Sequence, residues 1–245
     1  MNKKLFSPAV IVALDVEERG RALDLVETLL PRVRLFKVGS RLFTAEGPTF
    51  IRELAARGAS VFLDLKFHDI PATVEGSVRA ATAMGVMMMT VHASGGVAMM
   101  AAAAKAAADE AKRRGLERPL IVGVTVLTSL SREDLAGLCA SDVDLGALVL
   151  GLASRAREAG LDGVVASVEE AASIKRALGT GFAVVTPGIR PAGADLGDQK
   201  RVATPAAAAA SGSDFIVVGR PIIEAPSPLE AADAIIAELR GAGRS

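Results

Sequence analysis

The sequence lacks the features that would point to a disulfide-stabilised, nucleic-acid-binding or membrane protein. Its single cysteine, Cys139, cannot form an internal disulfide, which suits a reducing cytosol. The 28 Lys and Arg residues balance the 28 Asp and Glu residues, so no global charge attracts the chain to nucleic acid or to an anionic membrane. No apolar run reaches the roughly 18 to 20 residues of a transmembrane helix. We therefore expect a soluble, cytoplasmic protein that holds any anionic ligand by local contacts.

The composition that is present is that of a globular protein with a large core. Hydrophobic residues make up 51% of the 245 residues and charged residues 23%, which gives ample apolar content for a core and differs from the composition of a disordered chain. Short apolar runs recur, and each is followed by a longer alanine-rich, charged segment of helical character. Because no linker divides this pattern, we expect residues 1–245 to form a single domain.

The apolar runs predict eight strands, at Ala9–Asp15, Leu35–Gly39, Ser60–Lys66, Val86–His92, Leu120–Val126, Gly163–Ala166, Phe182–Thr186 and Phe215–Gly219. The segments after them predict helices at Arg19–Leu30, Gly47–Ala56, Thr73–Met84, Val97–Arg114, Leu145–Ala159, Val168–Leu178, Pro205–Ala210 and Leu229–Leu239. Near-continuous apolar strands that alternate with helices are typical of a parallel sheet, and this number of repeats fits a closed barrel better than an open sheet. The sequence therefore predicts an α/β fold, a single (β/α)8 TIM barrel.

Charged residues follow the apolar start of the third strand, in the stretch Asp64–Pro71. Asp64 and Lys66 alternate with apolar residues, so in an extended strand both side chains project from the same face as Phe62. Asp69 follows closely, before a proline that ends the strand. Two carboxylates therefore bracket one lysine.

The carboxyl ends of the first three strands all carry charges, and in an eight-stranded barrel the active site lies at these ends. Asp15 ends the first strand and Lys37 lies on the second. An alternating arrangement of Lys37, Asp64, Lys66 and Asp69 would let each ion be paired, which matters because an isolated buried charge is very costly. Such a cluster could be a stabilising ion-pair network, or a site tuned for proton transfer in which Lys66 is the acid.

The loops after the seventh and eighth strands each contain a glycine and an arginine, Gly188 with Arg190 and Gly219 with Arg220. These loops are the usual phosphate site of such barrels, because glycine lets backbone N–H groups approach and arginine adds a forked, charge-assisted contact. Each pair alone could be a turn glycine beside a surface charge. Their joint occurrence predicts a phosphorylated substrate.

The two histidines, His68 and His92, do not make a metal site by themselves, because the rest of a ligand set is missing. We expect His68 to hydrogen-bond locally and His92 to line the barrel mouth, with no metal bound. The sequence also contains no P-loop, no Rossmann glycine fingerprint after a strand and no nucleophile elbow.

The chain resembles the bacterial-type orotidine 5'-phosphate decarboxylase family along nearly its whole length. The matching motifs are Ala13–Asp15, Phe36–Gly39, Asp64–Thr73, Val91–Ala93, Leu127–Ser129, Pro187–Arg190, Asp198–Arg201 and Val218–Pro221. This resemblance implies a TIM barrel that converts orotidine 5'-phosphate into uridine 5'-phosphate, the last step of de novo pyrimidine synthesis. It implies neither a metal nor an organic cofactor.

The resemblance also implies a role for each charged residue of the barrel mouth. Lys66 would be the proton donor at the carbon that loses CO₂. Lys37, Asp64 and Asp69 would complete the charged network, and Asp15 and Lys37 would contact the ribose.

The remaining implied roles concern the other parts of the substrate and a second subunit. Thr128 would lie against the pyrimidine, and the phosphate end would be held by Arg190, Gln199, Gly219 and Arg220. The family completes its site across a homodimer interface, so Asp69, Ile70 and Thr73 would reach the partner's substrate.

Two other interpretations are consistent with parts of this pattern. One is a Mg²⁺-dependent decarboxylase or aldolase of the same barrel group, which shares the Asp-x-Lys-x-x-Asp pattern but acts on a sugar phosphate. The other is a noncatalytic nucleotide-binding barrel or a structural protein. The Phe67–Pro71 extension and the Pro187–Pro191 loop favour the pyrimidine enzyme, and the presence of both lysines and all the acids speaks against a noncatalytic barrel.

Overall fold

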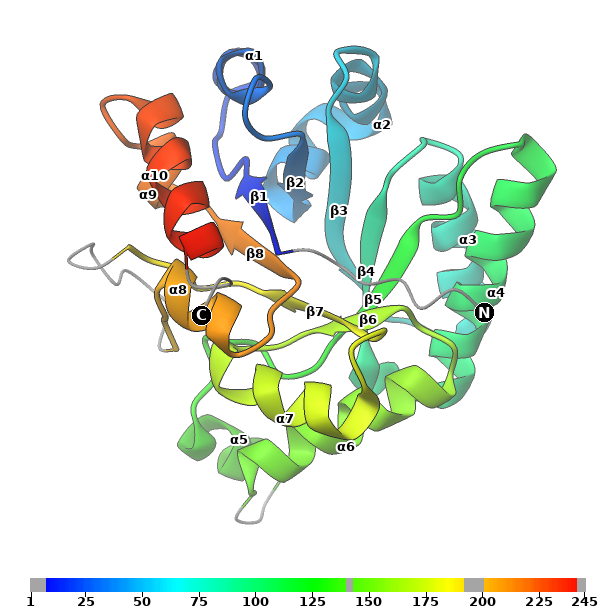
Figure 1. Ribbon diagram of the computed structural model, residues 1–245. Helices are drawn as coiled ribbons and strands as arrows, with labels where there is room; N and C mark the ends of the chain where they lie inside the picture. Colours follow the sequence, from blue (N-terminus) through cyan, green and yellow to red (C-terminus); the bar gives the residue numbers. More distant parts are fainter. Residues whose placement is uncertain (1–7, 140–142, 192–200, 242–245) are drawn as a thin grey trace.

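The computed structural model describes residues 8–139, 143–191 and 201–241, and its strands form one closed barrel (Figure 1). Each strand pairs in parallel with its neighbours in the sequence, and the last strand returns to the first. The strands are β1 (Ala9–Ala13), β2 (Leu35–Gly39), β3 (Ser60–Phe67), β4 (Met88–His92), β5 (Leu120–Val124), β6 (Gly163–Val165), β7 (Ala183–Thr186) and β8 (Phe215–Val218). The predicted (β/α)8 fold is confirmed.

Several predicted strands extend past the observed pairing. β1 ends at Ala13 and not at Asp15, and β5 ends at Val124 and not at Val126. Val126 is nevertheless buried, at 7% exposure. Apolar residues indicate that a segment is buried, but they do not show that its backbone pairs with a neighbouring strand. The predicted strands were therefore too long at their carboxyl ends.

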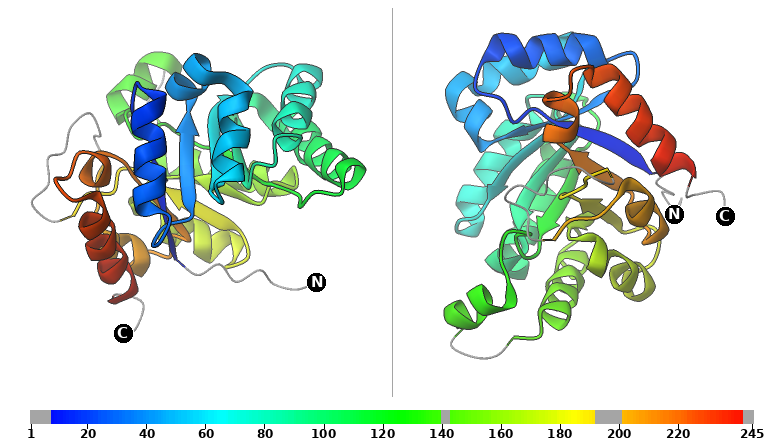
Figure 2. Two further views of the ribbon diagram at one scale, coloured as in Figure 1. Left: turned by 90° about the horizontal axis from the view of Figure 1, so that it is seen from above. Right: turned by 90° about the vertical axis from the view of Figure 1, so that its left-hand side faces the viewer.

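The helices form an outer layer around the strands, and the same arrangement is seen in the two turned views (Figure 2). They are α1 (Arg19–Leu29), α2 (Ser40–Ala56), α3 (Pro71–Thr82), α4 (Gly96–Arg114), α5 (Arg132–Cys139), α6 (Leu145–Glu158), α7 (Val168–Leu178), α8 (Pro205–Ala210), α9 (Arg220–Ile223) and α10 (Pro228–Gly241), with a short 3₁₀ turn, η1 (Ala93–Gly95). The last helix, α10, contacts the first, α1, so the helical layer closes at the same place as the barrel.

The helices that differ most from the prediction are α2, α5 and α9. α2 begins at Ser40 and not at Gly47. Gly47 has a positive φ of 67° and interrupts the helix at a kink, so the predicted start corresponds to the second segment of α2, near Pro48. α5 and α9 were not predicted. Both are short, with eight and four residues respectively, and too short for a helical apolar period to stand out.

The core has two layers, one inside the barrel and one between the barrel and the helices. Along β1, Ile11 and Ala13 belong to the inner layer, while Val10 and Val12 belong to the outer layer. Met88 and Met89 on β4 divide in the same way. Because both faces of each strand are covered, the strands read in the sequence as continuous apolar runs. None of the described helices has the length and hydropathy needed to cross a bilayer.

Two aspartates stabilise the end of the barrel opposite the mouth. Asp162, just before β6, accepts the backbone N–H of Ile121 at 2.9 Å, and Asp214, just before β8, accepts that of Val184 at 2.6 Å. Arg118 pairs with Asp162 at 2.8 Å. Charged residues at this end of the barrel thus serve strand pairing, which leaves the opposite mouth for a ligand.

Glu110 in α4 makes a contribution to stability that depends on pH. Its carboxylate accepts hydrogen bonds from Arg113 at 2.6 and 2.8 Å and from Arg114 at 2.5 Å. These arginines lower the pKa of Glu110 from 4.5 to about 2. Since the pKa in the folded protein lies below that in the unfolded chain, the stabilisation is complete above about pH 4.5 and is lost as the pH falls toward 2.

We therefore expect Glu110→Gln to lower the thermal unfolding midpoint at neutral pH, and the difference from the wild type to shrink as the pH falls to about 3. Thermal unfolding followed by circular dichroism over this pH range measures it. Glu117→Gln, a change at an exposed glutamate just beyond α4, is the matched control and should have no such effect. A difference of the same size at both pH values would refute the role of Glu110.

Candidate active site

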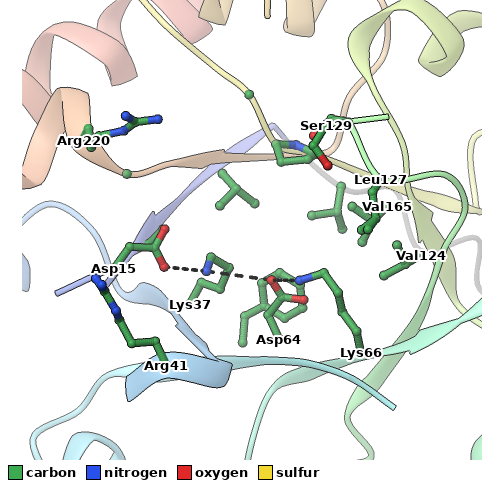
Figure 3. Close-up of a pocket in the computed structure, with 18 of the residues that line it drawn as sticks. Asp15, Lys37, Arg41, Asp64, Lys66, Val124, Leu127, Ser129, Val165 and Arg220 are labelled. Atoms are coloured by element: carbon green, nitrogen blue, oxygen red, sulfur yellow. Dashed lines mark hydrogen bonds and ion pairs between the residues drawn. The ribbon is translucent and has the colours of Figure 1, made fainter. Parts of the chain in front are cut away.

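A cavity of about 590 Å³ opens at the carboxyl ends of the barrel strands (Figure 3). The predicted site residues that line it are Asp15, Lys37, Asp64, Lys66, Thr128, Arg190, Gly219 and Arg220. Its other polar lining residues include Arg41, Ser129 and Glu224. The volume is in the range of cavities that hold small-molecule ligands.

Four charged side chains of opposite sign alternate across this cavity. Lys37 Nζ lies 2.9 Å from Asp15 Oδ1 and 3.8 Å from Asp64 Oδ2, and Lys66 Nζ lies 2.9 Å from the same Asp64 oxygen. Figure 3 shows them in a row in the order Asp15, Lys37, Asp64, Lys66. Each ion therefore contacts only ions of the opposite sign, which offsets the cost of removing it from water. We call this row the charged chain.

The barrel topology explains the order of the charged chain. Asp15 follows β1, Lys37 lies on β2, and Asp64 and Lys66 lie on β3, and these three strands are consecutive neighbours in the barrel. The register places Gly39 of β2 opposite Asp64. A Cβ atom at Gly39 would come within 3.2 Å of Lys37 Nζ, so glycine there leaves room for the ammonium group.

Exposure differs along the charged chain. The side chains of Lys37 and Asp64, in the middle, are 11% and 13% exposed. Those of Asp15 and Lys66, at the two ends, are 55% and 36% exposed. The central pair is therefore held within the protein, while the two end groups present polar atoms to a ligand in the cavity.

β3 is not a regular strand where it carries these charges. Its pairing with β4 shifts between Leu63 and Phe67, and Lys66 has a left-handed φ of 52°. Among the described residues it is the one non-glycine residue with positive φ. The prediction that Asp64 and Lys66 share a face is consistent with the cavity lining, but the regular extended strand on which it was based is wrong.

Asp69, Ile70 and Thr73 lie outside the cavity. Asp69 is exposed, and its Oδ1 accepts the backbone N–H of Ile70 at 2.6 Å. With Ile70, Pro71 and Ser94 it borders a second, shallower hollow of about 550 Å³. Within one chain, the second acidic residue in the alternating row of charges is therefore Asp15, beside Lys37. The sequence pattern had suggested Asp69, beside Lys66.

The opposite wall of the cavity is formed by the loops after β7 and β8. Gly188 has a left-handed φ of 75°, which only glycine adopts without strain. The backbone N–H of Arg190 donates to Ala203 O at 2.9 Å, and that of Ala203 donates to Gly188 O at 3.2 Å. These bonds hold Gly188 and Arg190 in a fixed backbone position. Gln199, which the sequence assigned to the phosphate end, lies outside the described residues.

The two ends of the cavity differ in chemistry. Figure 3 shows Arg220 on the side of Asp15, with Arg41 also near that end. Val124, Leu127 and Val165 lie on the side of Lys66. The cavity can therefore receive an elongated ligand with an anionic group at one end and a flat, less polar group beside Lys66.

The two histidines lie beside each other near the end of the charged chain. The ring centroids of His68 and His92 are 5.2 Å apart, with the planes inclined by 36°. Burial, and then the neighbouring His68 and Lys66, lowers the pKa of His92 below its usual value. Among the residues that the structure describes, no group of three or more His, Cys, Asp or Glu side chains could hold a metal ion.

Arg201 is a partly buried residue near the cavity, with its side chain 9% exposed, and the sequence did not predict its contacts. Its guanidinium pairs with Glu170, and its Nη2 lies 3.4 Å from the carbonyl oxygens of Val126 and Leu127. Glu170 in turn accepts the backbone N–H of Ser167 at 2.9 Å, at the start of α7. Arg201 thus ties the loop after β5, which carries Thr128, to the loop after β6. The Ser-x-x-Glu spacing could have indicated the helix cap, but no local signal links it to Arg201, 31 residues beyond Glu170.

Comparisons with known proteins agree with this geometry. The chain matches the model of the orotidine 5'-phosphate decarboxylase / HUMPS family over residues 8–235. It is 51% identical over 232 residues to the orotidine 5'-phosphate decarboxylase of Vibrio atlanticus (strain LGP32), covering 95% of this chain and 96% of that protein. It is also 51% identical over 230 residues to the enzyme of that name from Moorella thermoacetica, covering 94% of this chain and 91% of the other.

Solved structures show the same likeness. The crystal structure of orotidine 5'-phosphate decarboxylase from Lactobacillus acidophilus superimposes with a TM-score of 0.84 at 37% sequence identity, covering 94% of this chain and 98% of that one. The structure of the enzyme of that name from Pyrococcus horikoshii OT3 gives a TM-score of 0.75 at 28% identity, covering 95% and 99% of the two chains.

Proposed function

Because the chain belongs to the orotidine 5'-phosphate decarboxylase / HUMPS family, we propose that it converts orotidine 5'-phosphate into uridine 5'-phosphate and CO₂, the last step of de novo pyrimidine synthesis. The observation that carries this proposal is the charged chain Asp15, Lys37, Asp64 and Lys66, set in a cavity whose opposite wall contains Arg190 and Arg220. The protein is accordingly a carboxy-lyase.

Lys66 is the group that acts on the reacting carbon. When the bond to the carboxylate breaks, CO₂ leaves and the electron pair of that bond stays on the ring carbon. The ammonium group of Lys66 stabilises this developing negative charge and then transfers a proton to it, which yields the product. The apolar neighbours Val124 and Val165 strengthen the effect, because a charge acts more strongly where water is excluded.

Asp64 and Lys37 hold Lys66 in place for this step. Asp64 Oδ2 contacts Lys66 Nζ at 2.9 Å and lies 3.8 Å from Lys37 Nζ. Asp64 therefore lies near the carboxylate that departs, and its charge is compensated from both sides. We assign Asp64, Lys66, Lys37 and Asp69 to the catalytic network.

The substrate lies along the cavity with its phosphate away from Lys66. Arg190, Gly219 and Arg220 bind the phosphate, together with Gln199. Asp15 and Lys37 bind the ribose, and Thr128 contacts the pyrimidine. Support for this orientation comes from the placement of Arg220 near Asp15 and of the apolar wall near Lys66 (Figure 3).

The protein acts as a homodimer in which each subunit completes the site of the other. Asp69, Ile70 and Thr73 are exposed, and none of them lines the cavity of its own chain. Ile70 is 66% exposed, which is unusual for a large apolar side chain beside a hollow. These residues therefore reach the substrate of the partner, with Asp69 next to its Lys66.

The main alternative is a Mg²⁺-dependent sugar-phosphate decarboxylase or aldolase. The pairing of both carboxylates with lysines disfavours it, since a divalent cation between Asp15 and Asp64 would meet the ammonium group of Lys37.

We expect decarboxylation of orotidine 5'-phosphate to persist at full rate in excess EDTA. The change in ultraviolet absorbance of the substrate measures this rate. A rate abolished by EDTA and restored by Mg²⁺ would favour the alternative.

Removal of the proton donor should abolish turnover. We expect Lys66→Ala to lower kcat by about 10³-fold or more, because it removes both the electrostatic stabilisation and the proton. Lys105→Ala is the matched control, since the Lys105 side chain is 75% exposed on α4, and it should leave kcat unchanged. Wild-type activity in Lys66→Ala would overturn the assignment of the proton donor, and an inactive wild type would overturn the proposed function itself.

Mixed dimers test the proposed division of the site between subunits. We expect Lys66→Ala and Asp69→Ala each to be inactive alone. In a mixed dimer, one site loses both groups, whereas the other combines an intact Lys66 with an intact Asp69 from its partner. Activity should therefore return when the two purified variants exchange subunits. If Asp69 served its own subunit, each site of the mixed dimer would lack one group and no activity would return.

A further inference from the structure

Thr90 is a fully buried threonine on β4, at 0% exposure, and it lies where the register between β3 and β4 shifts. Leu63 pairs with Met89 and Phe67 pairs with Val91. Between these two pairs β3 advances by four residues and β4 by two. The residues from Asp64 to Lys66 therefore all lie opposite Thr90. Extra residues in one strand of a pair form a bulge, which re-aims the side chains that it carries.

The hydroxyl of Thr90 bonds to both charged residues of this bulge. Lys66 donates its backbone N–H to Thr90 Oγ1 at 2.8 Å, and Thr90 Oγ1 donates to Asp64 Oδ1 at 3.0 Å. The direction of these bonds is fixed, because an N–H group can only donate and a carboxylate can only accept. The single proton of the hydroxyl is therefore directed to the carboxylate of Asp64.

The first of these bonds holds a strained backbone. Lys66 adopts a φ of 52°, and this left-handed conformation is unfavourable for a residue with a Cβ atom. Such a conformation persists only where surrounding contacts enforce it. The bond from the Lys66 N–H to Thr90 is a contact of this kind, at the residue itself.

The second bond fixes the rotation of a carboxylate. Asp64 Oδ1 is held by Thr90, and this leaves Oδ2 directed at Lys66 Nζ, 2.9 Å away, and at Lys37 Nζ, 3.8 Å away. The last torsion of an aspartate side chain is soft, so without Thr90 the two oxygens would share these contacts in a range of orientations. One hydroxyl thus sets both the backbone of Lys66 and the position of its counter-ion.

We propose that Thr90 is a positioning residue for the decarboxylation: its hydroxyl holds the ammonium group of Lys66 in the reactive position by fixing Asp64 Oδ1 and the Lys66 backbone together. Because Thr90 is fully buried, it acts on the substrate only through these two residues. This inference rests on the proposed function and adds to it a residue from a fourth strand, beyond the ones that carry the charged chain.

The test is the substitution Thr90→Val, which keeps the shape of the side chain and removes the hydroxyl. We expect kcat to fall about tenfold or more, because a buried carboxylate oxygen and a buried N–H group lose their partner and Lys66 is no longer held. We expect KM and the calorimetric affinity for uridine 5'-phosphate to change less than kcat, since the proposed phosphate contacts at Arg190 and Arg220 lie on the opposite wall of the cavity. Thr90→Ser keeps the hydroxyl and should recover most of the turnover.

Thr82→Val on α3 is the matched control. Thr82 is also buried, at 1% exposure, and its hydroxyl has no hydrogen-bond partner among the residues that the structure describes. The same chemical change there should leave kcat at the wild-type value. If Thr90→Val does not fold, Thr90→Ser and Thr90→Ala form a second pair that differs by the hydroxyl alone, and their kcat values answer the same question.

The outcomes separate the two proposals. A wild type that does not decarboxylate orotidine 5'-phosphate overturns the proposed function. An active wild type whose kcat is retained in Thr90→Val overturns the role of Thr90. A fall in kcat that Thr90→Ser does not recover also overturns it, since turnover then does not follow the presence of the hydroxyl.

Discussion

The cost of holding charges out of water shapes the mouth of this barrel. Lys37 and Asp64 are nearly buried, and each would be strongly destabilising if its neighbour were removed. The alternation of sign along Asp15, Lys37, Asp64 and Lys66 satisfies this constraint, because every contact in the row is attractive. The closed parallel barrel makes the row possible, since β1, β2 and β3 lie side by side in chain order.

The same constraint directs the chemistry to the ends of the row. The central ions compensate each other, so the groups with exposed polar atoms are Asp15 at one end and Lys66 at the other. Lys66 borders the apolar wall of Val124 and Val165, whereas Asp15 lies toward Arg220. A single electrostatic arrangement therefore separates a reactive end from a binding end, and it needs no bound cofactor to do so in the proposed mechanism.

Sequence patterns predicted the parts of this site that depend on strand ends. Asp15, Lys37, Asp64 and Lys66 follow apolar strand segments, and the barrel rule places such residues together. Asp69, which the strand pattern suggested as a partner of Lys66 within the chain, instead borders a second hollow with Ile70 and Pro71, where α3 begins. Strand boundaries were less predictable, because residues such as Val126 remain buried after pairing ends.

The residues that the sequence did not reveal act through long-range contacts. Thr90 is a polar residue within the apolar run of β4, but its bonds depend on a register shift that no local pattern encodes. Arg201 is similar, since its partners lie in α7 and in the loop after β5. The left-handed backbone conformation of Lys66 also affects which substitutions the protein can accept during evolution or engineering. The backbone at position 66 would be most stable with glycine, whereas the reaction requires an ammonium group there. Selection for a more stable barrel and selection for a faster enzyme thus act in opposite directions on the same codon.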